Sequence, residues 1–181
     1  MKITIFGLEG TGKSSTAKKL AEDFGYEYKS TGAMMREMAK NEGITIEEFN
    51  TNRLNKIKET GDASADREID NHVKKYGSEN DNFVFESRLA WHLIPDSFKI
   101  NLVCSDEIRA GRVEVRDGIL KEVAMENNRR RQAENKEVFE TIYGIKNYPP
   151  ESNEFDLIID TEVLSLDKVV QEIQKNLNIV I

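Results

Sequence analysis

The chain has 181 residues, 38% of them hydrophobic and 33% charged, with a formal net charge of −7. This length suits one well-buried domain, and the negative charge disfavours broad nucleic-acid binding, which needs extended basic surfaces. No apolar run approaches the roughly 20 residues that span a bilayer, no signal-peptide pattern opens the chain, and a single cysteine excludes an internal disulfide framework. We therefore expect a cytoplasmic protein in which Cys104 is a small buried side chain.

Short apolar runs alternate with longer segments of helical periodicity, which is typical of α/β domains. The apolar runs predict strands at residues 2–6, 26–30, 82–87, 98–104 and 155–161. Helices are predicted at residues 12–24, 31–43, 64–76, 105–118, 119–143 and 165–177, with one more that begins at a capping box of Thr45 and Glu48. Helices between successive strands predict a parallel sheet covered on both faces, hence a three-layer α/β/α fold. The strand order is not readable from the sequence.

A glycine-rich segment follows the first predicted strand and leads into the first predicted helix. It fits the pattern G-x-x-x-x-G-K-[ST], in which backbone N–H groups and the helix dipole surround a phosphate. Lys13 would span the β- and γ-phosphates of ATP, and the Ser14 hydroxyl would ligate Mg²⁺. The residues predicted to bind ATP here are Gly7, Leu8, Glu9, Gly10, Thr11, Gly12, Lys13, Ser14 and Ser15.

A magnesium ion bound here also needs a carboxylate, usually at the end of a neighbouring strand. Glu86 closes the apolar run "FVFE" and is the predicted second ligand. Asp160 ends "LIID" in the same way, and we interpret it as a strand-end cap or a contact on the base side.

Besides Lys13, several arginines could supply positive charge to bound phosphates. Arg36 and Arg88 follow predicted strands, where open parallel sheets bind their ligands, and a guanidinium can hold a phosphate through two hydrogen bonds. Arg129, Arg130 and Arg131 form a run in the long polar helix, which would ordinarily be a solvated helix face.

These motifs together resemble the cytidylate kinases, especially their compact archaeal branch. The similarity covers nearly the whole chain and depends on "GLEGTGKSS", the "STG" and Arg36 segment, "EEFN", "DREID", "FVFESRLAW", "EIRAGRVEVRDG" and "IYGI". It implies a single P-loop NTPase domain over residues 1–181, with a monophosphate-binding insert at about 31–80 and an arginine-rich helical lid at about 112–147. The implied reaction transfers the γ-phosphate of ATP to CMP or dCMP with Mg²⁺, and the implied protein is a monomer.

The resemblance also assigns roles to residues. It implies that Thr31, Gly32, Arg36 and Arg88 hold the acceptor phosphate, and that Arg36 and Arg88 take part in catalysis with Lys13. Arg130 and Arg131 would close over the phosphates, assisted by Lys136, and Arg112 would open the lid and lie near the ATP base. A charged lid with few apolar anchors is expected to open and close.

Some positions depart from the family pattern. Ser87 stands where the family usually has glycine, Asn71 and His72 follow "DREID", and Asn135 and Val138 replace arginines. Asp66, Arg67 and Asp70 are candidates for reading the base, although a solvated helix face explains them as well. His72 and His92 have no metal-ligand spacing, and Trp91 is interpreted as packing beneath the acceptor site. Two alternatives therefore stay open: a kinase for AMP, UMP or a small metabolite, and an ATP-binding module without turnover.

Overall fold

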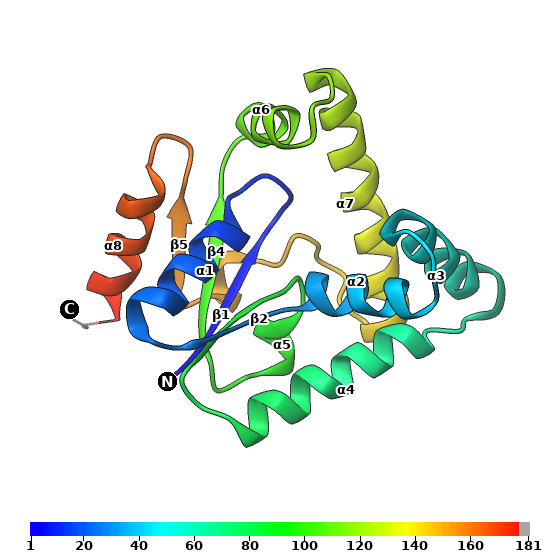
Figure 1. The fold of residues 1–181 in the computed structure, drawn as a ribbon, viewed down its shortest axis with the longest axis horizontal. Helices are drawn as coiled ribbons and strands as arrows, with labels where there is room; N and C mark the ends of the chain where they lie inside the picture. The colour runs from blue at the N-terminus through cyan, green and yellow to red at the C-terminus, as the bar shows by residue number, and fades with distance from the viewer. Residues whose placement is uncertain (178–181) are drawn as a thin grey trace.

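The computed structural model describes residues 1–177 as a parallel sheet with helices on both faces (Figure 1). The strands are β1 (Lys2–Gly7), β2 (Glu27–Ser30), β3 (Phe83–Glu86), β4 (Phe98–Val103) and β5 (Leu157–Asp160). They pair in the order β2-β3-β1-β4-β5, and every pairing is parallel. This confirms the predicted fold class and supplies the strand order.

Two apolar clusters lie on opposite faces of the sheet because alternate strand residues point to opposite sides. Ile3 and Ile5 of β1 pack against α1 (Lys13–Phe24) and α8 (Leu166–Asn176). Phe83 and Phe85 of β3 face the other way, toward the short α5 (Ala90–Leu93) and residues of the insert and lid. Strands buried on both faces explain their almost unbroken apolar sequences.

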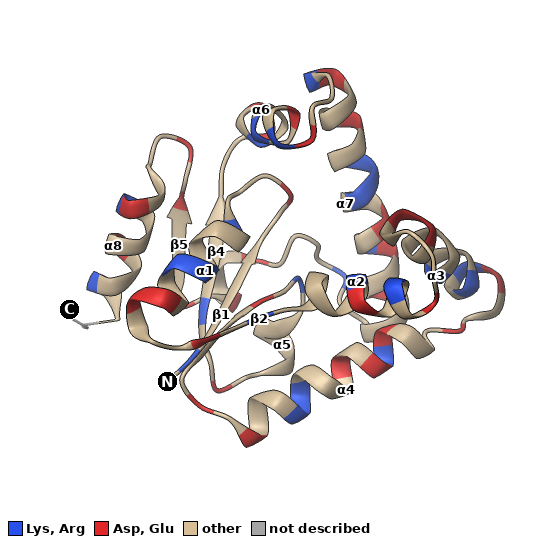
Figure 2. Ribbon diagram, viewed as in Figure 1, with Lys and Arg blue, Asp and Glu red and all other residues tan. Residues whose placement is uncertain are grey.

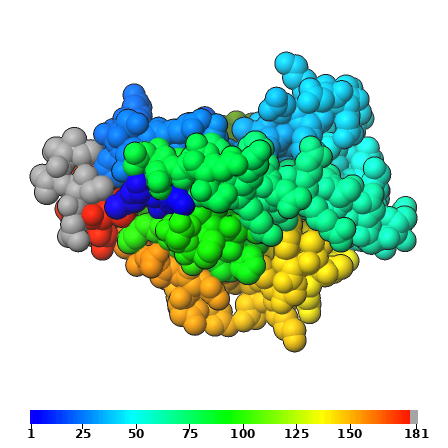
Figure 3. All heavy atoms as spheres, turned by 90° about the horizontal axis from the view of Figure 1, so that it is seen from below, coloured from blue at the N-terminus to red at the C-terminus, as the bar shows by residue number. Residues whose placement is uncertain are grey.

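The segment between β2 and β3 forms the helices α2 (Thr31–Asn41), α3 (Ile46–Thr60) and α4 (Ser64–Glu79). Thr45 and Glu48 form the predicted capping box at the start of α3. In Figure 3, the cyan and teal atoms of α2 and α3 make up one end of the molecule, and the yellow end of α7 lies beside them. These three helices are the segment that the sequence analysis expects to form the insert.

The proposed lid consists of α6 (Asp106–Asp117) and α7 (Lys121–Tyr143). Ala110 and Val113 of α6 pack on Ala124 of α7 in a small cluster separate from the two large ones. At the other end of α7, Val138 and Phe139 are buried in the cluster beneath the sheet. The expectation of weak anchoring was therefore wrong for this end of α7, because its apolar residues are concentrated in the last two turns.

Several boundaries also differ from the predictions. Helix α4 continues to Glu79, three residues past the predicted end, and β5 is shorter at both ends than the apolar run. Ser105 precedes α6 as predicted, but its side chain makes no cap hydrogen bond. Cys104 is half-buried rather than buried, beside the guanidinium of Arg112. None of the helices within residues 1–177 is long and apolar enough to cross a membrane.

Candidate active site

The glycine-rich loop connects β1 to α1 at the carboxyl edge of the sheet. Gly10 and Gly12 have φ values of 84° and 87°, in the left-handed region that favours glycine. A Cβ on Gly10 would lie 2.5 Å from the backbone oxygen of Arg109, so α6 approaches the loop too closely for a larger residue. Helix α1 begins at Lys13 without a side-chain cap. Its first backbone N–H groups are therefore available to an anion, as the motif predicts.

Two arginines of α6, the helix after β4, hydrogen-bond to backbone carbonyl groups of the loop. Arg109 is buried, and its Nε donates to the backbone oxygen of Glu9 at 2.8 Å. Arg112 donates to the Thr161 hydroxyl at 3.0 Å and to the Gly10 carbonyl at 3.4 Å, and Thr161 Oγ1 donates to the Thr11 carbonyl at 3.1 Å. These bonds hold the loop carbonyls outward, which favours N–H groups turned toward the phosphate position.

The predicted magnesium ligands meet at the end of β3. The register pairs Ile5 with Glu86, so the strand end lies beside the loop, and Ser14 Oγ donates to Glu86 Oε1 at 2.7 Å. Tyr28 donates to the other oxygen, Oε2, also at 2.7 Å. Burial and this bond to Glu86 raise the pKa of Tyr28 to about 12, so the phenol stays a donor at neutral pH. One carboxylate and one hydroxyl fit Mg²⁺, which takes few protein ligands and completes its shell with water and nucleotide phosphates.

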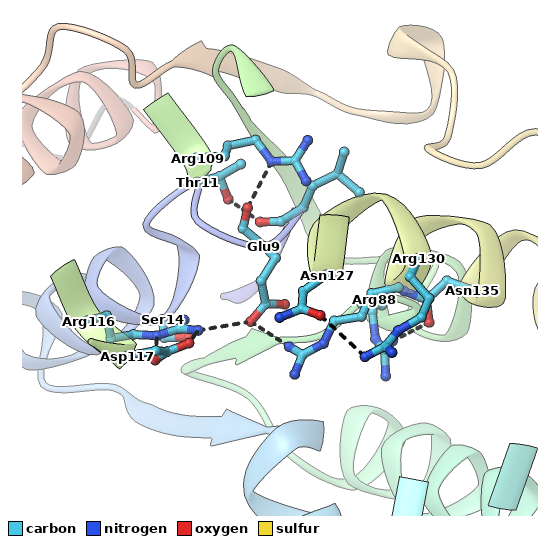
Figure 4. Close-up of polar contacts among 12 residues, drawn as sticks. Glu9, Thr11, Ser14, Arg88, Arg109, Arg116, Asp117, Asn127, Arg130 and Asn135 are labelled. Carbon is cyan, nitrogen blue, oxygen red and sulfur yellow. Dashed lines mark hydrogen bonds and ion pairs between the residues drawn. The ribbon is translucent and has the colours of Figure 1, made fainter. Parts of the chain in front are cut away.

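Glu9 pairs with arginines of the lid (Figure 4). Its Oε1 lies 3.2 Å from Arg131 Nη1 and 3.6 Å from Arg116 Nη2. Burial opposes the charge on Glu9, but Lys13, Arg131, Arg116 and Arg88 outweigh it and hold the pKa of this carboxyl below its usual value. Four cations thus converge on one carboxylate at the mouth of the loop, and a phosphate placed there would meet the same field.

Arg88 lies between two adjacent pockets. The first pocket includes Lys13, Glu9 and Arg131, and the second extends toward the insert. Arg88 lines both, and its guanidinium hydrogen-bonds to the Asn135 side chain of α7. Trp91 Nε1 donates to the Arg88 carbonyl at 3.1 Å, and the Trp91 side chain is buried. The predicted packing of Trp91 is confirmed, and its place beneath an acceptor site stays a prediction.

The second pocket is bounded by α2, α3, α4, α7 and the end of β3. Its polar residues include Thr31 and Ser87, whose hydroxyls lie 3.3 Å apart. The buried Asp66 and Asp70 of α4 also line it, each with a partner: Arg53 of α3 for Asp66 and Tyr143 of α7 for Asp70. Arg67, the third base-reading candidate, is exposed and outside the pocket.

The lid arginines differ in orientation. Arg131 lines the loop pocket, whereas Arg130 is 66% exposed and lies near Glu134 and Asn127 of its own helix. Figure 2 shows this arginine run as a blue band halfway along α7. Lys136 is exposed. Arg36 is exposed too, with its guanidinium 3.5 Å from the position that a Cβ on Gly32 would take.

The sequence analysis missed several residues of the two pockets. Arg53 could have been recognised from the sequence, because it lies between Phe49 and Ile57 on the buried face of α3. A charged residue on a buried face must be paired or functional. Arg109 and Tyr143 had none, since each takes its place through contacts far apart in the sequence, and Asn128 is one polar residue among many in its helix. Tyr28, which lies outside both pockets and bonds to Glu86, had no signal either. His72 and His92 are exposed. Asp160 accepts a hydrogen bond from the Glu162 backbone at 2.8 Å, which is the predicted strand-end cap.

Residues 2–163 match the model of the cytidylate kinase-like family. The chain belongs to this family. A cytidylate kinase from Pyrococcus furiosus is 36% identical over 168 residues, which cover 92% of this chain and 83% of that protein. A cytidylate kinase from Methanocorpusculum labreanum is 32% identical and is covered to 92%. The resemblance inferred from the motifs is confirmed, and the chain is a cytidylate kinase-like phosphotransferase, for which ATP is the implied donor.

Among solved structures, a shikimate kinase from Bacteroides thetaiotaomicron aligns over 99% of both chains, with a TM-score of 0.67 and 15% identity. At this identity the likeness shows the P-loop kinase fold alone.

Proposed function

We propose that this cytidylate kinase-like protein transfers the γ-phosphate of ATP to CMP or dCMP with Mg²⁺. One observation carries the proposal: Arg88 lines both the loop pocket and the pocket that faces the insert. A guanidinium between two phosphates can bind the acceptor and stabilise the group in transfer. The names of the relatives support CMP as the acceptor.

On the donor side, the loop N–H groups and Lys13 bind the β- and γ-phosphates. Ser14 and Glu86 would hold Mg²⁺, which neutralises phosphate charge and fixes the phosphate geometry when it is bound. Tyr28 keeps the Glu86 carboxylate oriented through the bond to Oε2. Arg112 lies where the lid begins and would contact the ATP base from there.

On the acceptor side, Thr31, Gly32 and Arg36 begin α2 and bind the phosphate of the nucleoside monophosphate together with Arg88. An oxygen of that phosphate attacks the γ-phosphorus while the bond to the β–γ bridging oxygen breaks, and ADP leaves. Lys13, Arg88 and Arg131 neutralise the charge during transfer. No side chain has to remove a proton, because the attacking phosphate oxygen is already anionic at neutral pH.

Before transfer, the lid would close over the bound phosphates. Arg131 already faces the loop pocket, so a bound phosphate can take it over from Glu9. Arg130 faces away in this structure and would reach the phosphates only after α7 moves. Closure excludes water, which would otherwise hydrolyse ATP.

The test is the rate of ADP formation from Mg·ATP with CMP, dCMP, UMP, AMP or GMP, and without acceptor. We expect CMP and dCMP to give the highest kcat/KM, and the Lys13→Ala variant to lose the activity. A higher kcat/KM with another nucleotide would support phosphoryl transfer but refute CMP and dCMP as the preferred acceptors. ADP binding without any acceptor-dependent rate would favour a binding module. The cytoplasmic location and the monomeric state stay predictions, and the molar mass in solution tests the latter.

A further inference from the structure

Asn128 is a buried polar residue of α7 that the proposed mechanism does not use. It is 7% exposed, and it lines the loop pocket together with Lys13, Arg88 and Arg131. Within the part of the chain that the structure describes, residues 1–177, Asn128 Nδ2 is buried and has no hydrogen-bond partner. An unpaired buried donor costs the protein free energy, and a ligand that brings an acceptor to it recovers this cost.

The helical spacing of α7 explains why Asn128 reaches this pocket. Ala124, one turn earlier, packs against α6, whereas Arg131 and Gln132, three and four residues later, line the pocket. The Arg131 side chain is 50% exposed, so Asn128 is the more deeply buried of the two. The contact of Ala124 with α6 holds this turn of the helix in place, and the amide is therefore positioned before a ligand binds.

The charges of the loop pocket indicate which acceptor suits this donor. Lys13, Arg88 and Arg131 are cations and carry no acceptor oxygen. The Glu9 carboxylate also lines the pocket, but it is already paired with Arg131 at 3.2 Å. A ligand with several anionic oxygens can bind the cations and still accept a hydrogen bond from Asn128. A phosphate group has this pattern.

We propose that Asn128 Nδ2 donates to an oxygen of the γ-phosphate of ATP and positions this group for transfer. Arg88 lines both this pocket and the acceptor pocket, so a phosphate held between Lys13 and Arg88 is the one that is transferred. A fixed neutral donor stabilises the negative charge there, and a further buried cation would cost far more to desolvate. This assignment rests on the proposed function, because it places ATP at the loop.

Entry of the phosphate requires a rearrangement of the lid. The free volume of the loop pocket in this state is about 20 Å³, which is room for about one water molecule. The γ-phosphate therefore enters as Glu9 releases Arg131 and α7 shifts. Asn128 and Arg131 belong to the same face of one helix, so they approach the phosphate together.

The decisive variant is Asn128→Leu, because leucine branches at the same atom as asparagine and has no donor. The dissociation constants of Mg·ADP and of Mg²⁺ with the non-hydrolysable imido analogue of ATP are measured by calorimetry. We expect the affinity for the imido analogue to fall at least tenfold, as for loss of a hydrogen bond to a charged group, and the affinity for ADP to stay within twofold. The value of kcat with CMP should also fall at least tenfold. Asn52→Leu, the same change on the exposed side of α3, is the matched control and should leave all three values unchanged.

A purely structural role of Asn128 would change the affinities for ADP and the imido analogue by the same factor. That result, or unchanged affinities and kcat, would overturn the inference. Because leucine is larger than asparagine, Asn128→Ala is tested in parallel, and the same selective loss of the imido analogue is expected. Since the donor has no protein partner to lose, we expect both variants to fold. A wild-type protein that binds neither nucleotide, or transfers no phosphate to any acceptor, would instead refute the proposed function.

Discussion

Replacing Glu9 by glutamine removes the carboxylate that pairs with two lid arginines, and we expect the variant to bind Mg·ADP about fivefold more tightly. The reason is competition. Arg131 and Arg116 contact Glu9 at 3.2 and 3.6 Å in this structure, and a nucleotide phosphate that recruits them must displace that carboxylate. Glutamine keeps the size of the side chain but gives up the charge.

The magnitude follows from the exposure of the two arginines. Their side chains are 50% and 54% exposed, so water screens both ion pairs, and each contributes on the order of 0.2–1 kcal/mol. Together they oppose phosphate binding by about 1 kcal/mol, which corresponds to about a fivefold change in Kd at 25 °C.

The assay is calorimetric titration of wild type and Glu9→Gln with Mg·ADP at low and high salt. The gap between the two proteins should narrow at high salt, because exposed charges are screened there. Glu134→Gln is the control, since Glu134 lies 3.8 Å from Arg130 and outside the loop pocket. An affinity that stays equal or becomes weaker in Glu9→Gln would refute the competition.

Three further predictions follow from the loop and the lid. Arg131→Ala should lower kcat at least a hundredfold and Arg130→Ala less than tenfold, and equal losses in steady-state assays would contradict the lid geometry. Gly10→Ala should lower the free energy of unfolding in urea by about 1–3 kcal/mol, because its Cβ would lie 2.5 Å from the Arg109 carbonyl at a φ of 84°. The fold lowers the pKa of Glu9 from 4.5, so its charge stabilises the native state fully above about pH 4.5, and this contribution disappears as pH falls through the lowered pKa. The stability difference between wild type and Glu9→Gln should therefore shrink as the pH falls below about 4.5. A difference that stays constant there would contradict the lowered pKa of Glu9.

The sequence predicts those features of the site that depend on neighbours along the chain. The loop from Gly7 to Ser14 is a local motif, and Glu86 is recognisable because it ends an apolar run. That Glu86 reaches Ser14 depends on the pairing of Ile5 with Glu86, which places the end of β3 beside the loop. The sequence predicts a parallel sheet but not that β1 and β3 are neighbours, so the structure supplied this pairing.

Contacts between distant segments could not be predicted in this way. Arg130 and Arg131 are adjacent in a polar helix, and the packing of Ala124 at one end and of Val138 and Phe139 at the other fixes which of them faces the loop. Arg53 and Asp66 belong to separate helices, α3 and α4, and no local pattern connects the two residues. The spacing of Phe49, Arg53 and Ile57 is that of one helix face, which is a signal for a buried Arg53 but carries none for its partner.

The central claim is that a γ-phosphate bound at the loop passes across Arg88 to a nucleotide in the insert pocket. The most direct measurement uses ATP radiolabelled in its γ-phosphate and unlabelled CMP, with separation of the products by chromatography. The account predicts labelled CDP with wild-type protein and a loss of at least a hundredfold in Arg88→Ala. Label that appears only as inorganic phosphate, or a full rate of labelled CDP without Arg88, would contradict it.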